Sequence, residues 1–337
     1  PVTELKRSER LKNCNKISYQ ENDIEILMCV NHSLLEIPSC YQDISKRDDR
    51  VKWEEAINTE INSLLQNKTW TLVSKPKNKN IVDCKWVFTI KNDINGNPCK
   101  YKARLVAKGF SQQYLSDYTE TFAPVARIST LRIHAIAFAN QFNLLVHQMD
   151  VQTAYLNGLL KEEIFMQIPE GINSDNENVV CKLNKALYGL KQSARCWFER
   201  FDEILKQHNF KNSTVDRCLY FLEKGHVREN IYVILYVDDL LIVTGKMNTM
   251  SAFKNHLMHQ FKMVDLNEAK IFLGIRIQRT ESEILLDQCQ YLKTVLNKFN
   301  MSECKPINTP LPMKIDYIAL NTDDNYNAPC RNLIGCL

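Results

Sequence analysis

The spacing of hydrophobic residues changes several times along the chain, which indicates a mixture of helices and strands. Apolar residues recur at helical spacing in five segments, residues 53–70, 129–142, 186–208, 249–261 and 288–300. Alternating or continuous apolar runs, typical of strands, occupy residues 84–110, 144–150, 231–245 and 269–278. These elements do not follow the regular strand–helix–strand order of a parallel sheet. We therefore predict an α+β fold, with an antiparallel sheet covered by helices on one face.

A basic β-hairpin is predicted in residues 84–110. Two alternating segments flank Asn95-Gly96, a dipeptide strongly favoured in tight hairpin turns. Between Lys75 and Lys108, nine basic residues face only two acidic ones, a local net charge of +7. Such a hairpin is suited to binding a polyanion, although a solvated charged face would have the same composition.

Two adjacent acids interrupt the most apolar segment of the chain, IYVILYVDDLLIVTG at residues 231–245. The segment predicts a strand buried on both faces, although its position also suits a hairpin. Burying Asp238 and Asp239 without a partner costs several kcal/mol each, and the two charges repel. Asp150 ends another predicted strand, so three carboxylates could meet at one sheet edge if the strands are neighbours. Mg²⁺ prefers oxygen ligands, and the acids therefore indicate a metal site for phosphoryl transfer. A turn or a solvated surface is the alternative.

The composition is that of an ordinary globular protein. The 337 residues are 45% hydrophobic and carry a net charge of only +4, so total charge says little about partners. The length suggests two or three subdomains. Twelve cysteines are scattered without a C-x-x-C pair, which favours reduced thiols over disulfides or a zinc site. No apolar run has the length of a membrane span, and no signal peptide is evident.

Several blocks of sequence, taken in order, resemble one family. The blocks are YKARLVAKGF, TFAPVARIST, HQMDVQTAYLNG, LYGLKQSARCWF, YVDDLLIVTG and FLGIRI. They are similar to the reverse transcriptase region of copia-type LTR retrotransposon Pol polyproteins, over roughly residues 50–337. Ala194 stands where many members have proline, and Asn267 where many have glycine. Neither departure involves the acids, so neither argues strongly for an inactive enzyme.

The resemblance implies a right-hand polymerase with fingers, an antiparallel-sheet palm covered by helices, and a partial thumb. Residues 1–50 would be a tail or linker from the upstream polyprotein, and residues 51–128 the fingers. Residues 129–281 would form the palm, with a fingers-like contribution. Residues 282–337 would be the thumb or connection, cut before ribonuclease H.

The resemblance also assigns roles to individual residues. Asp150, Asp238 and Asp239 would be the catalytic acids, holding two Mg²⁺ ions (or Mn²⁺) with help from the Val151 carbonyl. Asp150 and Asp238 would be the principal ligands and Asp239 an auxiliary acid. Tyr155 would exclude the ribose 2′-hydroxyl. The other expected contacts are Lys102, Arg104, Lys108, Tyr188, Gly189, Lys191 and Gln192 for the nucleotide and template, and Phe272, Leu273 and Gly274 for the primer.

The activity implied is RNA-directed DNA polymerisation by two-metal phosphoryl transfer, a nucleotidyltransferase reaction. Its partners would be RNA and DNA templates, a primer such as one derived from tRNA, dNTPs, and the integrase, ribonuclease H and capsid domains of the polyprotein, with no membrane. We expect a cytoplasmic location in virus-like particles, with a possible nuclear stage. Two alternatives remain: a decayed module that only binds nucleic acid or assembles particles, and a palm-type nucleotide cyclase. The intact acids disfavour the first, and the basic hairpin argues against the second.

Overall fold

The computed structural model describes residues 37–92, 98–172, 178–306 and 330–336. The chain divides into two compact units. The main unit is Glu36–Asp287, and the C-terminal unit contains Gln288–Leu337 together with Pro1–Leu35. Most of the predicted tail, residues 1–36, lies outside the described residues, as do the Asn95-Gly96 turn and residues 307–329.

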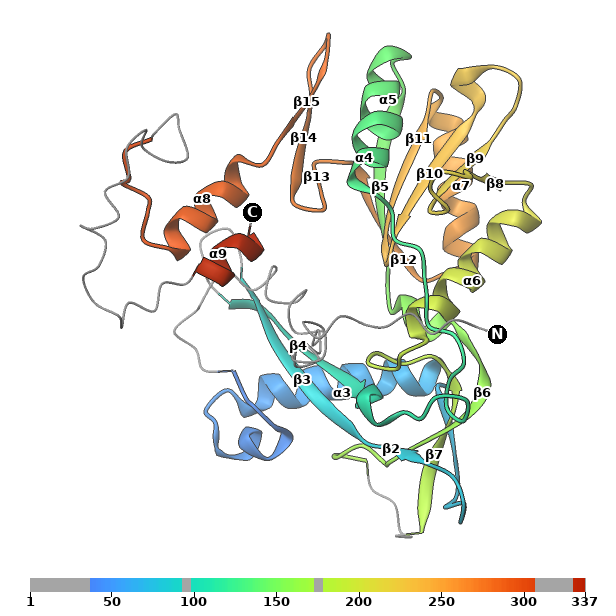
Figure 1. Ribbon diagram of the computed structural model, residues 1–337, viewed down its shortest axis with the longest axis vertical. Coiled ribbons are helices and arrows are strands. Elements are labelled where there is room, and N and C mark those ends of the chain that lie inside the picture. Colours follow the sequence, from blue (N-terminus) through green and yellow to red (C-terminus); the bar gives the residue numbers. More distant parts are fainter. Residues whose placement is uncertain (1–36, 93–97, 173–177, 307–329, 337) are drawn as a thin grey trace, which may run out of the picture. The chain divides into compact units, whose positions relative to one another are not determined.

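The main unit is built around a six-stranded antiparallel sheet (Figure 1). The apolar segment 231–245 is a hairpin of two strands rather than one strand. Val237, at φ +54°, and Asp238 form its turn, so both halves of the apolar run are buried side by side. In sheet order the strands are β12 (Met263–Glu268), β5 (Leu145–Val151), β11 (Asp239–Thr244), β10 (Ile231–Tyr236), β9 (Leu219–Leu222) and β8 (Lys211–Asn212).

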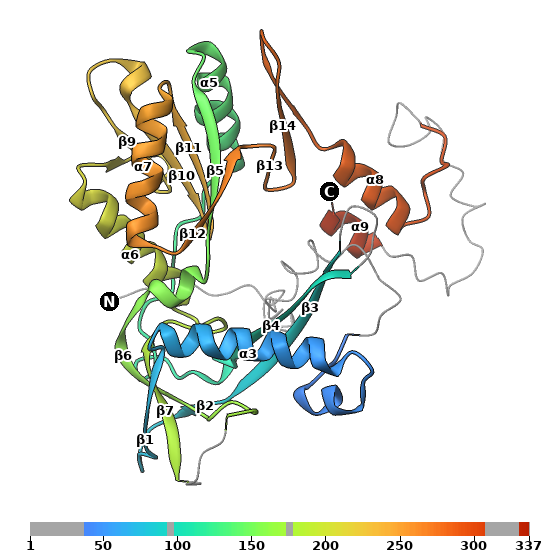
Figure 2. The same ribbon diagram turned by 180° about the vertical axis from the view of Figure 1, so that it is seen from behind.

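Helices cover both faces of this sheet. Residues directly opposite on paired strands share a face, and Tyr220, which contacts Phe201 of α6, lies on the face away from Asp150. Phe138 of α5 contacts Tyr232, which lies on the same face as Asp150. Figures 1 and 2 show α7 and α5 on opposite sides of the strands. The helices concerned are α6 (Ser193–Gln207), α7 (Met247–Gln260), α4 (Ile128–Thr130), the π-helical η3 (Leu131–Ala137) and α5 (Phe138–Gln141).

The α+β class is therefore confirmed, but the expectation of helices on a single face is wrong. The reason is that the central strands β10 and β11 are apolar at nearly every position. Ile242 and Val243 point to opposite faces and are both almost completely buried. A strand of this composition requires apolar cover on both sides.

A second apolar core lies around helix α3 and the β3–β4 hairpin. Trp53 of α3 is fully buried and its ring meets Phe88 and Tyr101 of the hairpin edge-on. Ile44, within the predicted tail, also belongs to this core. The elements are η1 (Tyr41–Lys46), α3 (Arg50–Gln66), β3 (Cys84–Asn92), β4 (Pro98–Ala107), η2 (Gly109–Ser111), and a four-stranded sheet of β1 (Trp70–Ser74), β7 (Val179–Lys185), β6 (Leu159–Met166) and β2 (Ile81–Val82).

A small three-stranded sheet ends the main unit. Residues 269–278, predicted as one strand, form part of a hairpin whose turn is Leu273 and Gly274, both at positive φ. The boundary between the two compact units falls at Gln288, because residues 284–287 pair within this sheet. The predicted division into fingers, palm and thumb stays a prediction. The remaining elements are η4 (Ala154–Asn157), η5 (Val227–Glu229), β13 (Ile271–Phe272), β14 (Ile275–Arg279), β15 (Ile284–Asp287), and in the C-terminal unit α8 (Cys289–Lys298) and α9 (Cys330–Cys336). Among the described residues, no helix combines the length and apolar character needed to cross a membrane.

Candidate active site

The three acids lie together at one end of the central strands. Asp150 on β5 is directly opposite Asp239 on β11. Asp238 occupies the β10–β11 turn, and its carbonyl oxygen accepts a hydrogen bond from the Val151 N–H at 2.8 Å. The Trp197 indole N–H stabilises the turn by donating a hydrogen bond to the Val237 carbonyl at 2.5 Å. The strand pairing that the sequence could not reveal is therefore present.

Burial and repulsion by neighbouring acids raise the pKa of two of the acids, Asp239 and Asp150. Burial raises the pKa of Asp239 to about 6, and the neighbouring Asp238 and Asp150 charges add to this, while a hydrogen bond from Gln148 at 3.0 Å opposes it. The pKa of Asp150 is also raised, first by burial and then by Asp238. A cation bound among these carboxylates would offset both effects.

The donor set fits a hard divalent cation. Asp150, Asp238 and Asp239 offer only oxygen ligands, and no thiol or imidazole competes as part of the cluster. Within the described part of the chain, no three His, Cys, Asp or Glu side chains converge tightly enough to form a ready-made metal site. The acids would therefore supply part of the coordination, with water and substrate phosphates completing it, as is usual for Mg²⁺.

The β3–β4 hairpin turns a basic face toward the acids. Its buried face packs on α3, and five basic residues at the alternate positions lie on the opposite face: Lys85, Lys91, Lys100, Lys102 and Arg104. The charges of Lys102, Lys91 and Arg104 are close enough to offset part of the rise in the pKa of Asp150. Burial and the Arg104 charge lower the pKa of Lys102 to about 8. Positive and negative groups thus face one another across the site.

Two tyrosines lie beside Arg104. Tyr155, in η4 just after β5, meets the Tyr188 ring edge-on at 4.8 Å between centroids. The Arg104 guanidinium carbon is 5.2 Å from the centroid of the Tyr188 ring. Burial raises the pKa of Tyr188, and the Asp238 charge acts in the same direction. Both tyrosines therefore belong to the same site as the acids.

Two other residues predicted to contact the nucleotide or template, Lys108 and Gln192, are bonded to other residues of the protein. Lys108 forms an ion pair with Asp83 at 2.5 Å, at the opposite end of β4 from the turn. Gln192 is only 1% exposed, and its amide nitrogen donates to the Asp117 carbonyl at 2.8 Å. The polar atoms of Gln192 are thus used inside the protein, and its contact with the nucleotide stays a prediction. Lys191 is exposed, with its ammonium 5.5 Å from the centroid of the Tyr118 ring.

Gly189 has a structural reason to be glycine. It lies in a turn before α6, because the predicted helix 186–208 begins only at Ser193. Its φ is +89°, and a Cβ atom there would lie 2.1 Å from the Ala107 carbonyl oxygen. The Tyr188 carbonyl accepts a hydrogen bond from the Ala107 N–H at 2.8 Å. The turn therefore docks backbone-to-backbone on the end of β4 and carries Tyr188 to the site.

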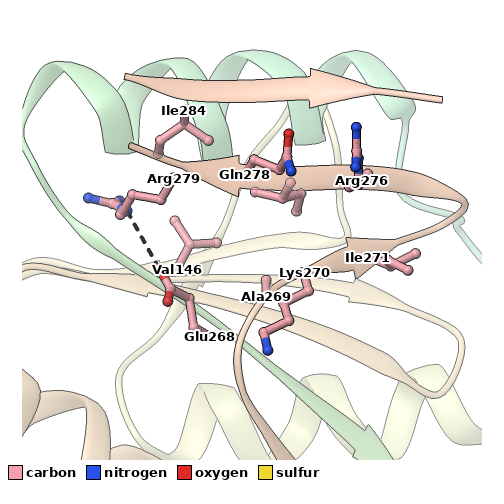
Figure 3. A pocket seen from close by; sticks show the side chains of 10 residues that line it. Val146, Glu268, Ala269, Lys270, Ile271, Arg276, Gln278, Arg279 and Ile284 are labelled. Carbon is pink, nitrogen blue, oxygen red and sulfur yellow. Dashed lines mark ion pairs between the residues drawn. The ribbon is translucent and has the colours of Figure 1, made fainter. Parts of the chain in front are cut away.

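The predicted primer contacts differ in accessibility. Phe272 is fully buried in the core, so its side chain cannot touch a primer. Leu273 and Gly274 form the turn, with open space around Gly274. A cavity of about 400 Å³ lies between this hairpin and the β5–β12 edge (Figure 3). Arg279 and Glu268 line it and form an ion pair at 3.8 Å.

Gln148 and Lys91 also belong to the site, although sequence reasoning did not single them out. Gln148 lies two residues before Asp150, so strand alternation puts both on one face. Lys91 lies on the same face of β3 as Thr89 and Val87, which are directly opposite Lys102 and Arg104. In both cases, the alternation of strand residues between two faces would have placed the residue on the same side as a predicted site residue.

Comparison with known proteins decides the family. Residues 67–313 match the family described as reverse transcriptase (RNA-dependent DNA polymerase). The chain belongs to this family. It is 39% identical over 277 residues to the retrovirus-related Pol polyprotein from transposon TNT 1-94 of Nicotiana tabacum, covering 81% of this chain and 21% of that protein. It is 38% identical over 267 residues to the corresponding polyprotein from transposon RE1 of Arabidopsis thaliana, covering 79% of this chain and 18% of that protein.

The predicted relationship to retrotransposon reverse transcriptases is thereby confirmed. The chain spans about a fifth of the length of these polyproteins. Among solved structures, the foamy viral protease-reverse transcriptase in complex with double-stranded DNA aligns with a TM-score of 0.36 and 12% identity, over 73% of this chain and 37% of that one.

Proposed function

We propose that this chain copies an RNA template into DNA by transferring nucleotides from dNTPs to a primer 3′-hydroxyl, with release of pyrophosphate. The observation that carries the proposal is the cluster of Asp150, Asp238 and Asp239 facing the basic side of the β3–β4 hairpin. A nucleotidyl transfer requires anionic ligands for metal ions and cationic groups for the triphosphate. Both are present in one site.

The acids would hold the metal ions. Asp150 and Asp238 would be the principal ligands, with Asp239 and the Val151 carbonyl in support. When bound, two divalent ions would lower the pKa of the primer hydroxyl and neutralise the leaving pyrophosphate. Gln148 donates to Asp239 and keeps that carboxylate oriented along the sheet edge.

The hairpin would bind the incoming nucleotide. Lys102, Arg104 and Lys91 carry charges that act on Asp150, so a triphosphate held there would lie between the cations and the acids. Tyr155 would lie against the sugar, with Tyr188 packed on its ring. Lys108, paired with Asp83, is a weaker candidate for this role.

A second feature supports a single-stranded template as the partner. Tyr114 is 63% exposed, and its ring centroid is 5.7 Å from that of Tyr118. Lys191 lies over Tyr118, and the Lys191 N–H donates to the Gln112 side chain at 2.8 Å. The exposed Tyr114 ring, next to the partly buried Tyr118 ring and the Lys191 cation, is suited to stacking an unpaired base and neutralising phosphate. The same turn carries Tyr188, so this surface adjoins the nucleotide site.

A primer-extension assay on an RNA template with Mg²⁺ tests the proposal. Wild-type protein should extend the primer only in the presence of template, and Asp238→Asn should abolish extension while the protein remains folded. Asp48→Asn, which changes an exposed acid outside the site, is the matched control and should behave as wild type.

The assay also separates the alternatives. No extension and no other nucleotide product from folded wild-type protein would favour a decayed binding module, whereas formation of a cyclic mononucleotide from a nucleoside triphosphate, with the primer unchanged, would favour a cyclase. Near-wild-type extension by Asp238→Asn would remove this residue from the metal site. Residence in virus-like particles, and association with integrase, ribonuclease H and capsid domains, are further proposals that rest on the family alone.

A further inference from the structure

A buried lysine joins three elements beneath the active site. Lys254 on α7 is 4% exposed, and a buried ammonium group requires compensating partners. Its Nζ lies 2.6 Å from Nδ1 of His147 on β5 and 2.7 Å from Oδ1 of Asp265 on β12. His147 is on the same strand as Asp150, three residues earlier. Lys254 therefore connects the catalytic strand with the edge strand β12.

Asp265 anchors a bulge in β12. Its Oδ1 also accepts a hydrogen bond from the Asn267 N–H at 2.8 Å. The pairing of β12 with β5 shifts between Asp265 and Asn267, so Leu266 is the extra residue. Asn267 has φ +60°, a conformation that asparagine and glycine tolerate better than other residues.

The bulge controls where the following hairpin lies. On one side of it, Val264 is paired with Asp150. On the other side, the Ala269 N–H donates to the Val146 carbonyl at 3.0 Å, and the chain then enters the hairpin (Figure 3). A bulge bends its strand and increases the local twist. Its geometry therefore sets the direction from Asp150 toward the Leu273–Gly274 turn.

We propose that Asp265 is a positioning residue for polymerisation: its side-chain oxygen fixes the β12 bulge and so holds the Leu273–Gly274 turn in place relative to Asp150, while Lys254 compensates the charge of the carboxylate. The link to polymerisation rests on the proposed function and on the expectation, from the family resemblance, that this turn holds the primer end. Stability alone is a poor explanation of the pair, because a buried ion pair can often be replaced by apolar residues without loss of stability.

Two double variants separate positioning from stability. Lys254→Met with Asp265→Leu removes the charges and the acceptor for the Asn267 N–H. Lys254→Met with Asp265→Asn removes the same charges but retains a side-chain oxygen as acceptor. Each is compared with wild type by thermal unfolding, by hydrogen exchange at the Asn267 and Ala269 amides, and by single-turnover nucleotide addition at saturating substrates. Should the leucine variant not fold, Asp265→Ala in the Lys254→Met background provides the same comparison.

The leucine variant should unfold near the wild-type temperature yet exchange the two amides about tenfold faster or more, and add nucleotides slower by a similar factor. The asparagine variant should stay within about threefold of wild type in both measurements. Equal exchange and addition rates in the two double variants would overturn the proposal. Hydrogen exchange does not need activity, so a wild-type protein that fails to polymerise would count against the proposed function and leave the test of the bulge intact.

Discussion

Asp150 and Asp239 face each other directly across β5 and β11, while the other neighbour of Asp150 is Val264 on β12. The carboxylate at the centre of the site therefore has an acid on one side and an apolar residue on the other. Burial disfavours its ionised form, and repulsion by the Asp238 charge acts in the same direction, so both raise the pKa of Asp150. Acids in an apolar hairpin are therefore unfavourable for the stability of the metal-free protein, but the same grouping of carboxylates is suited to binding a metal ion.

The acid cluster should make the metal-free protein less stable as pH rises. The pKa of Asp239 is raised to about 6, so the folded state binds this proton more tightly than the unfolded state. Its contribution to the free energy of unfolding is complete below about pH 4 and is lost as pH rises to about 6. Asp239→Asn should therefore equal wild type near pH 4 and exceed it by about 1–2 kcal/mol at pH 7, after allowance for solvent screening. Urea unfolding with a chelator, repeated across this range, measures the difference. A gap that does not change with pH would argue against a buried, repelled carboxylate.

Removing the basic groups nearest to the acids should weaken dNTP use. Lys102→Ala combined with Arg104→Ala should raise KM for dNTP about tenfold or more, because charge-assisted contacts with phosphate are lost. Lys108→Ala is the matched control: its ammonium is paired with Asp83, so KM should change little. Steady-state kinetics on a fixed primer–template distinguish the two. A larger effect from Lys108→Ala would mean that the ion pair opens when nucleotide binds.

Tyr155 should discriminate against ribonucleotides. A ring against the sugar would clash with a 2′-hydroxyl, and a pocket wall of this kind is usually worth about 1–3 kcal/mol. Tyr155→Val should therefore raise ribonucleotide incorporation about tenfold or more, with a smaller loss for dNTPs. Tyr155→Phe retains the ring and should remain selective. The ratio of kcat/KM for dNTP and rNTP decides the matter. If both sugars lose activity equally and the protein is less stable, Tyr155 is only a packing residue beside Tyr188.

Two glycines at positive φ should respond differently to alanine. Gly274→Ala meets open space, so only backbone strain of about 1 kcal/mol is expected. Gly189→Ala adds a clash with the Ala107 carbonyl and should cost about 3 kcal/mol or more. Denaturant unfolding of the two variants provides the comparison. Similar losses would show that the turn before α6 can move away from β4.

The element types were largely accessible from the sequence. Helical spacing predicted α3, α6, α7 and α8, and the Asn95-Gly96 dipeptide predicted the β3–β4 hairpin. The errors concern chain reversals inside apolar segments. The runs at residues 231–245 and 269–278 are both hairpins, with turns at Val237–Asp238 and Leu273–Gly274. In the first, no glycine or proline marks the turn, so the sequence left one long buried strand and a hairpin as alternatives, and the structure shows the hairpin.

By itself, the sequence determined the family, the α+β class and the acids, because ordered motifs and local periodicity are properties of short segments. Only the tertiary structure decided which segments meet. It paired Asp150 with Asp239, turned Lys102 and Arg104 toward them, and buried Gln192 while pairing Lys108 with Asp83. Periodicity predicts which face of a strand a residue occupies, but the neighbour of that strand depends on how all the apolar faces are buried together.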